Sequence, residues 1–160
     1  MSDILDELSK SARERVDSGY YETNHGAMEF EPETHFTEVI EGGYPTPIIG
    51  EIKPGSPSRG RILGEDFQPA ELGRTYSAGG ATGFSVLTDP DHFFGSLENL
   101  AGVAKLNKPT LMKDFVVDYS QIRAGREFGA GAVLLIYRLF TRGEAFFDLD
   151  KGIAYAHELF

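Results

Sequence analysis

Two oppositely charged side chains stand two positions apart in the segment PIIGEIKPGSPSRG, residues 47–60. They are Glu51 and Lys53, and both come at the end of a short apolar run. Because alternate residues of a strand point to the same side of a sheet, the two charges should face one cavity. The Gly, Ser and Pro residues that follow are typical of an ordinary turn, and they would equally bind an anion through Ser56, Ser58 and backbone amides. The spacing predicts a charged site where a strand gives way to its loop.

A second lysine, Lys113, ends another apolar run within PTLMKDF, residues 109–115. Folds of the α/β class place their active sites at the carboxyl ends of strands, so Lys53 and Lys113 are candidate site residues. In a partly dry pocket a lysine can serve as an acid, a base or a Schiff-base nucleophile. Paired with a substrate anion, it stays charged and binds. The structural alternative for Lys113 is an ion pair with Glu51 or Asp114.

Adjacent aromatic residues mark a third candidate region, in SVLTDPDHFFGSLENL. Phe93 and Phe94 are expected in a loop between a strand and a helix, where they would wall a pocket for an aromatic ligand or pack the loop itself. His92 is either a general acid or an exposed loop histidine. Ser96 is expected to cap the following helix.

The elements that must position these residues alternate along the chain. Four apolar runs, at 47–52, 82–88, 109–115 and 132–137, predict strands buried on both faces, and helical patterns follow them at 68–79, 96–107, 118–130 and 143–160. Residues 2–17 also have helical spacing, with Ser2 or Asp3 as a cap, and residues 17–36 read as an irregular connection or a short helix. Strict alternation favours an α/β fold, either a doubly wound sheet or a barrel.

Composition excludes several classes of partner. The 160 residues carry a net charge of −10, which argues against nucleic acid as the main partner. There is no apolar run near the roughly 18 residues that span a bilayer and no secretory pattern, so we expect no membrane association and a cytoplasmic location. The chain has no cysteine, and its four histidines lie far apart, so we expect no metal.

Five segments in this order resemble indole-3-glycerol phosphate synthase of tryptophan biosynthesis: IIGEIKPGSPSRG, DFQPAELGRTYSAGGATGFSVLTD, HFFGSLENL, LMKDFVVDYSQI and GAGAVLLI. The resemblance runs from about residue 47 to the end, and the N-terminal helix is similar to the helical extension that precedes the barrel in that family. It implies a TIM barrel, with residues 1–46 as the extension and residues 47–160 as the first four strand–helix units.

The resemblance also implies a reaction, a carbon–carbon lyase step without metal or organic cofactor. The substrate is a small aryl-sugar phosphate, 1-(2-carboxyphenylamino)-1-deoxyribulose 5-phosphate, whose indole ring closes with release of carbon dioxide and water. Lys113 matches the family's general acid. Lys53 matches a lysine that contacts substrate anions and takes part in dehydration, and Glu51 matches the acid that positions both lysines. Ser56 corresponds to a contact with the substrate carboxylate, and Phe93 to the aromatic residue that packs on the anthranilate ring.

The chain departs from that family chiefly in length. A complete barrel has eight strands and commonly about 250 residues. The family's second catalytic glutamate, its substrate-orienting Asn and Arg and its phosphate-binding glycines and serine belong to later strands. We therefore expect activity only when a C-terminal half is supplied, and association through open sheet edges with that half or with a second copy. Gly55 is a smaller departure, since several relatives carry a larger residue there.

Two other functions fit the same residues. A non-catalytic anion-binding half-barrel module would retain Glu51, Lys53 and Ser56 without turnover. A Schiff-base lyase on a related barrel would use Lys113 as its nucleophile.

Overall fold

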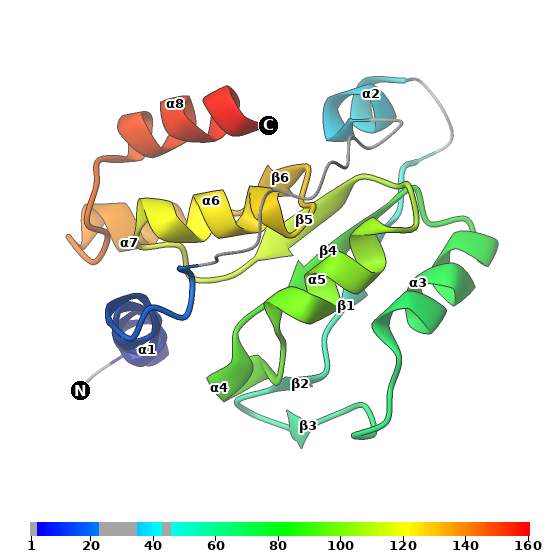
Figure 1. Cartoon of the computed structure of the whole chain (residues 1–160), viewed down its shortest axis with the longest axis horizontal. Helices are drawn as coiled ribbons and strands as arrows, with labels where there is room; N and C mark the ends of the chain where they lie inside the picture. Colours follow the sequence, from blue (N-terminus) through cyan, green and yellow to red (C-terminus); the bar gives the residue numbers. More distant parts are fainter. Residues whose placement is uncertain (1–2, 23–34, 43–45) are drawn as a thin grey trace.

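A parallel sheet of four strands forms the centre of the computed structural model, which describes residues 3–22, 35–42 and 46–160 (Figure 1). Its strands are β1 (Ile49–Ile52), β4 (Gly83–Leu87), β5 (Thr110–Lys113) and β6 (Ala132–Val133). They lie in the order β1–β4–β5–β6, so each new strand is added at the same edge. A doubly wound sheet reverses this order at its switch point, whereas a barrel does not. The topology therefore favours the barrel.

The four expected strands are confirmed in position and order, but the last is shorter than predicted. Only Ala132 and Val133 pair with β5, and the amide of Leu134 donates one further bond to the carbonyl of Met112 at 3.1 Å. The chain then enters the short helix α7 (Tyr137–Thr141). Among the described strands β6 is an edge, so no second ladder extends it. Burial on both faces holds throughout β4, whereas Ile49 of the edge strand β1 is exposed.

Helices follow the sheet strands where the sequence predicts them. They are α3 (Pro69–Ala78), α5 (Leu97–Ala104), α6 (Tyr119–Glu127) and α8 (Leu149–Leu159). The Ser96 hydroxyl accepts from the amide of Asn99 at 3.1 Å, which confirms the expected cap of α5. Helix α8 begins later than residue 143, because Gly143 adopts a positive φ of 68° after α7 and residues 143–148 form a connection.

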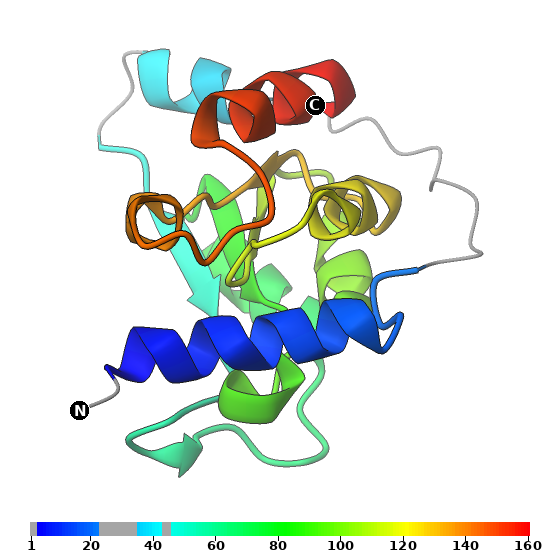
Figure 2. The ribbon, with the colours of Figure 1, turned by 90° about the vertical axis from the view of Figure 1, so that its left-hand side faces the viewer.

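Smaller elements gather at the two ends of the sheet. Helix α1 (Ile4–Asp17), helix α4 (Pro90–Phe93) and the hairpin of β2 (Gly55–Ser56) with β3 (Gly60–Arg61) lie at one end, and α2 (Phe36–Glu41) lies with α8 at the other (Figure 2). Asp3 caps α1, while Ser2 lies outside the described residues. Residues 23–34 of the segment expected to be irregular also lie outside them.

Two apolar clusters hold these layers together. The larger joins buried strand residues such as Ile52, Phe84 and Met112 to Leu100 of α5 and to Tyr21. The smaller docks α1 by packing Ala12 against Val117 and Leu139, which follow β5 and β6. The N-terminal helix is thus held at the carboxyl end of the sheet. Within the described ranges, no helix combines the length and apolar content that a membrane span requires.

Candidate functional site

Glu51, Lys53 and Lys113 form one cluster at the carboxyl ends of β1 and β5. Glu51 lies within β1, Lys53 directly follows that strand, and Lys113 is the last residue of β5. One carboxylate oxygen of Glu51 lies 2.8 Å from the Lys53 ammonium, and the other accepts a hydrogen bond from Lys113. Each of the three side chains is about one third exposed. The structure therefore brings together the three residues expected to be catalytic, and Lys113 pairs with Glu51 rather than with Asp114.

The charges of this cluster do not cancel. Two ammonium groups face one carboxylate, which leaves an excess positive charge in a chain whose net charge is −10. Burial opposes ionisation of Glu51, but the hydrogen bonds from Lys113 and Lys53 outweigh it and lower the pKa of Glu51 below its ordinary value. Glu51 is consequently held as a carboxylate, and the cluster can attract and orient an anion.

Ser56 belongs to the hairpin that follows β1. Its hydroxyl is 3.5 Å from that of Ser58. The hairpin packs against Phe94, because the Arg61 guanidinium lies 4.7 Å from the centre of that ring. Gly55 makes this contact possible, since a Cβ there would lie 2.3 Å from the Phe94 ring and 2.6 Å from the Gly60 carbonyl oxygen. The departure at position 55 thus has a structural reason.

Phe93 ends helix α4 and is half-buried. Its ring centre lies 6.0 Å from that of Phe115, which is two residues beyond Lys113. Through this contact with Phe115, Phe93 packs against the segment that also carries Lys113. Phe94, expected in the same loop, adopts a positive φ of 56° at the end of α4 and turns to the hairpin.

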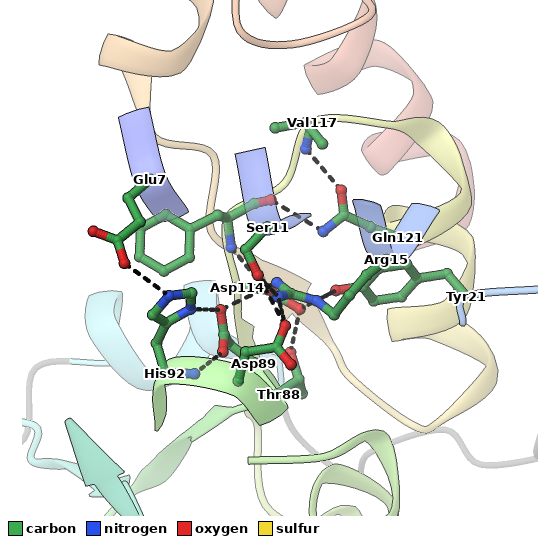
Figure 3. Close-up of polar contacts among 12 residues, drawn as sticks. Glu7, Ser11, Arg15, Tyr21, Thr88, Asp89, His92, Asp114, Val117 and Gln121 are labelled. Carbon is green, nitrogen blue, oxygen red and sulfur yellow. Dashed lines mark hydrogen bonds and ion pairs between the residues drawn. The ribbon is translucent and has the colours of Figure 1, made fainter. Parts of the chain in front are cut away.

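The interpretation of His92 as an exposed loop histidine is wrong. The residue belongs to α4, and its side chain is only 18% exposed. The ring lies between Glu7 of α1 and Asp89, with each nitrogen 3.6 Å from a carboxylate oxygen (Figure 3). Packing of α1 over α4 covers this ring, and the sequence around His92 gives no sign of that contact.

A second polar cluster lies beneath α1 and was missed by reasoning from the sequence (Figure 3). We call it the Arg15 cluster; its members are Arg15, Tyr21, Thr88, Asp89, Asp91 and Asp114. One signal was present: Leu8, Ala12 and Arg15 fall on one face of a helix, so a charged residue occupies a position where an apolar one is expected. Asp89 directly follows the strand predicted at 82–88, and Asp114 directly follows β5.

Asp89 and Asp91 of this cluster, together with the neighbouring His92, are of the types that bind metals, and their ligand atoms lie within 4.8 Å of one another. Both carboxylates, however, form ion pairs with Arg15, at 3.1 and 2.7 Å. The guanidinium therefore already supplies the cation that these acids face. Of the four histidines considered at the outset, His25 lies outside the described residues.

Comparison with known proteins gives one consistent answer. The model of the family described as indole-3-glycerol phosphate synthase matches residues 5–159. Proteins of that name are 36% identical in Neisseria gonorrhoeae strain NCCP11945, covering 99% of this chain and 63% of the relative, and 41% identical in Burkholderia multivorans, covering 85% and 55%. Another, from Methanocaldococcus jannaschii, is 47% identical over 70% of this chain and 41% of its own length. The chain spans about half the length of the curated relatives it matches.

Proposed function

This chain belongs to the indole-3-glycerol phosphate synthase family, and we propose that it supplies the catalytic lysines of such an enzyme. The family fold is a TIM barrel, and the four parallel strands in unreversed order are one half of it. The observation that carries the proposal is the cluster in which Glu51 contacts both Lys53 and Lys113. We further propose residues 1–46 as the helical extension and residues 47–160 as the half barrel.

The proposed reaction converts 1-(2-carboxyphenylamino)-1-deoxyribulose 5-phosphate into indole-3-glycerol phosphate. The ring carbon that bears the carboxylate attacks the ketone carbon, and a new carbon–carbon bond forms. The bond to the carboxylate breaks, carbon dioxide leaves, and its electron pair restores the aromatic ring. The former ketone oxygen, whose π bond to carbon broke when the ring carbon attacked, takes up two protons in all and leaves as water with assistance from the lone pair of the ring nitrogen. The adjacent methylene carbon then gives up a proton to the base that we expect on a later strand of the completed barrel, and the remaining double bond of the indole forms. The proposal invokes no metal and no organic cofactor.

The cluster fits the acid steps of this sequence. Lys113 donates a proton to the ketone oxygen as the ring carbon attacks, and a positioned acid of this kind contributes a factor on the order of 10²–10⁴ in rate. Lys53 binds the substrate anions and assists departure of water, while Glu51 holds both ammonium groups in place. Because these charges are fixed before substrate binds, they stabilise the charge that develops in the transition state.

Two further residues are proposed to bind the substrate. Ser56 would contact the carboxylate from the hairpin, and Phe93 would pack on the anthranilate ring. The position of Phe93 beside Phe115, two residues beyond the proposed acid, supports that role. The hairpin that carries Ser56 follows Lys53 directly in the chain, which supports a contact with the same ligand.

We propose that turnover needs the part of the relatives' length that this chain does not span. The edge strand β1 supports association with a complementary half barrel, because Ile48 and Ile49 are 57% and 45% exposed at that edge. A second copy of the chain is the other partner that could cover such an edge. We also propose a cytoplasmic location, which imaging of a tagged chain would test.

Indole fluorescence tests the function directly. The substrate is given to the purified chain alone, and then to the chain mixed with a separately expressed C-terminal half from a relative, with Lys113→Ala as the matched control. Signal only in the wild-type mixture supports the proposal, and signal from the chain alone supports a self-assembled enzyme. A folded mixture that binds a product-like aryl phosphate without turnover would instead favour the non-catalytic anion-binding module.

A Schiff-base mechanism is tested in the same samples. Borohydride would trap a keto substrate on Lys113 if its nitrogen were a nucleophile. In the structure that nitrogen is engaged as a hydrogen-bond donor to Glu51, which supports the acid role instead. Turnover by Lys113→Arg would exclude the Schiff base.

A further inference from the structure

Arg15 is a charged residue at a core position of helix α1. It is 6% exposed, and with Leu8 and Ala12 it lies on the face that packs against the carboxyl end of the sheet. Burial works against its charge, but Asp114, Tyr21 and Asp89 outweigh that effect and keep the pKa of Arg15 above its ordinary value. Arginine at such a position is stable only when its hydrogen bonds are satisfied.

The guanidinium has five N–H donors, and the structure gives it five contacts. Nε donates to the Tyr21 hydroxyl at 3.1 Å, Nη1 to Ser11 at 2.9 Å and Asp91 at 2.7 Å, and Nη2 to Asp89 at 3.1 Å and Asp114 at 3.3 Å. Figure 3 shows Ser11, Tyr21, Asp89 and Asp114 gathered around Arg15. A lysine would keep the charge but has only three donors on one nitrogen, so it cannot reproduce this set.

Asp114 connects Arg15 to the proposed acid, because it is the next residue after Lys113. Its carboxylate accepts from Arg15, from the hydroxyls of Tyr21 and Thr88 at 2.8 Å each and from the amide of Phe115 at 2.8 Å. Burial raises the pKa of Asp114 and Arg15 opposes that rise. Asp114 is buried whereas Lys113 is partly exposed, so the two neighbours face different sides of the chain. Fixing Asp114 therefore fixes the backbone from which Lys113 extends.

Asp89 connects Arg15 to the aromatic residue in the same way. Asp89 follows β4 and caps α4, accepting from the amide of His92 at 2.7 Å, and Phe93 is the next residue along. Asp91 lies within that short helix. One side chain thus joins α1 to the segment that carries Phe93 and to the segment that carries Lys113.

We propose that Arg15 is a positioning residue of the active site, which holds Lys113 against Glu51 and Phe93 beside Phe115 through Asp114 and Asp89. The expected effect of Arg15 on turnover rests on the proposed function. Its expected effect on the contact between Lys113 and Glu51 rests on geometry alone. It makes α1 a part of the site that touches no substrate itself.

The test uses the intact chain and follows the ¹³C signal of the Glu51 carboxyl group by NMR against pH. In Arg15→Lys the titration midpoint of Glu51 should rise toward its ordinary value, because Lys113 is no longer held against it. Because the lysine keeps the positive charge at position 15, a shift of the Glu51 midpoint reports a change in the position of Lys113 and not the loss of a charge. The matched control is Arg13→Met, which removes a contact between the same helix and Glu144, away from the cluster; it should leave the midpoint where it was.

A second variant keeps the test decisive if Arg15→Lys does not fold. Tyr21→Phe removes only the hydroxyl that joins Arg15 to Asp114 and should shift the Glu51 midpoint in the same direction by less. A folded Arg15→Lys or Tyr21→Phe protein with an unchanged Glu51 midpoint would overturn the inference. In the completed enzyme, Arg15→Lys should lower kcat by about tenfold or more through misplacement of the acid, with a smaller change in KM. Absence of indole fluorescence from the wild-type mixture would contradict the proposed function, while the Glu51 titration would still test the role of Arg15.

Discussion

Glu51 and Lys113 meet across strand β4, although 62 residues separate them in the chain and neither strand pairs with the other. The side chains bridge the strand between them on one side of the sheet. This contact places a carboxylate from the first sheet strand and an ammonium group from the third in one hydrogen bond. Its consequences can be measured in the folded chain, independently of turnover.

The Glu51 contacts should make stability depend on pH. Because the folded-state pKa of Glu51 is lowered, its contribution is present above the ordinary glutamate value of about 4.3 and is lost as pH falls through the folded-state pKa. The free energy of unfolding of Glu51→Gln should therefore lie below that of the wild type at pH 7, and the gap should close on acidification. Urea denaturation at several pH values measures it. The control Glu14→Gln, in an exposed pair with Lys10, should show little gap at any pH.

Lys113 and Phe93 should affect different kinetic constants in a completed barrel. Loss of a general acid predicts that Lys113→Ala lowers kcat by a factor on the order of 10² or more. Phe93→Ala should act mainly on KM, because the ring is proposed to bind rather than to transfer protons. Steady-state indole fluorescence separates the two constants. An unchanged kcat in Lys113→Ala would remove the acid role from this residue.

Gly55 should tolerate no larger side chain. Gly55→Ala places a methyl group against the Gly60 carbonyl oxygen and the Phe94 ring, so it should destabilise the chain by about 1–3 kcal/mol. Gly102, inside α5, is the matched control: a Cβ there meets nothing within 4 Å, and Gly102→Ala should stabilise the helix by about 0.5–1 kcal/mol. Thermal unfolding should show a lower melting temperature for Gly55→Ala and a higher one for Gly102→Ala than for the wild type. Equal stability of Gly55→Ala and the wild type would mean that the hairpin is not docked on Phe94.

Gln121 should be essential to the turn between β5 and α6. The oxygen of its buried side-chain amide accepts from the backbone N–H of Val117 at 2.8 Å (Figure 3) and from that of Asp118 at 3.2 Å. Its side-chain nitrogen donates to the Phe115 carbonyl at 3.0 Å. Gln121→Ala leaves these backbone groups unpaired and should cost about 1–3 kcal/mol.

Gln121→Glu keeps the acceptor but places an oxygen against the Phe115 carbonyl, so this variant should also be destabilised. The neighbouring Ser120 hydroxyl is buried with no hydrogen-bond partner among the described residues, and Ser120→Ala should therefore be neutral or slightly stabilising. Urea denaturation of the three variants compares them. A Gln121→Ala protein as stable as Ser120→Ala would contradict this account.

The lysine–glutamate cluster could be predicted because it depends on local rules. Two-residue spacing places Glu51 and Lys53 on one side of a strand, and the placement of α/β sites at strand ends selects Lys113. The Arg15 cluster could not, because Arg15 meets Asp89 and Asp114 from 74 and 99 residues away. Nothing in the local sequence of α1 states which strand ends it will cover.

The predicted end of β6 and the predicted start of α8 differ from the structure for the same reason, because both depend on contacts with distant parts of the chain. Residues 132–137 are apolar throughout and read as a full strand, yet pairing stops at Val133 and Ile136 already begins helix α7 as its N-cap. Helix α8 begins at Leu149 rather than at residue 143, since Gly143 adopts a positive φ and the amide of Phe146 donates to the carbonyl of Val117 at 2.7 Å, which ties the connection to the segment after β5. Strand ends and helix starts depend on neighbours that a local pattern does not contain.

The distance along the chain between α1 and its charged partners also sets the order in which they are synthesised. Arg13 contacts Glu144, and Asp3 and Asp6 contact Arg142, across 131 to 139 residues. On a ribosome that adds about 5–20 residues per second, α1 emerges on the order of 10 s before the last of these partners exists. The aspartate partners of Arg15 follow it by 74 to 99 residues, so in the first part of that interval the arginine has none of them to pair with. Helix α1 is therefore made before the strand ends that bury its arginine, and it can dock on them only after they have formed.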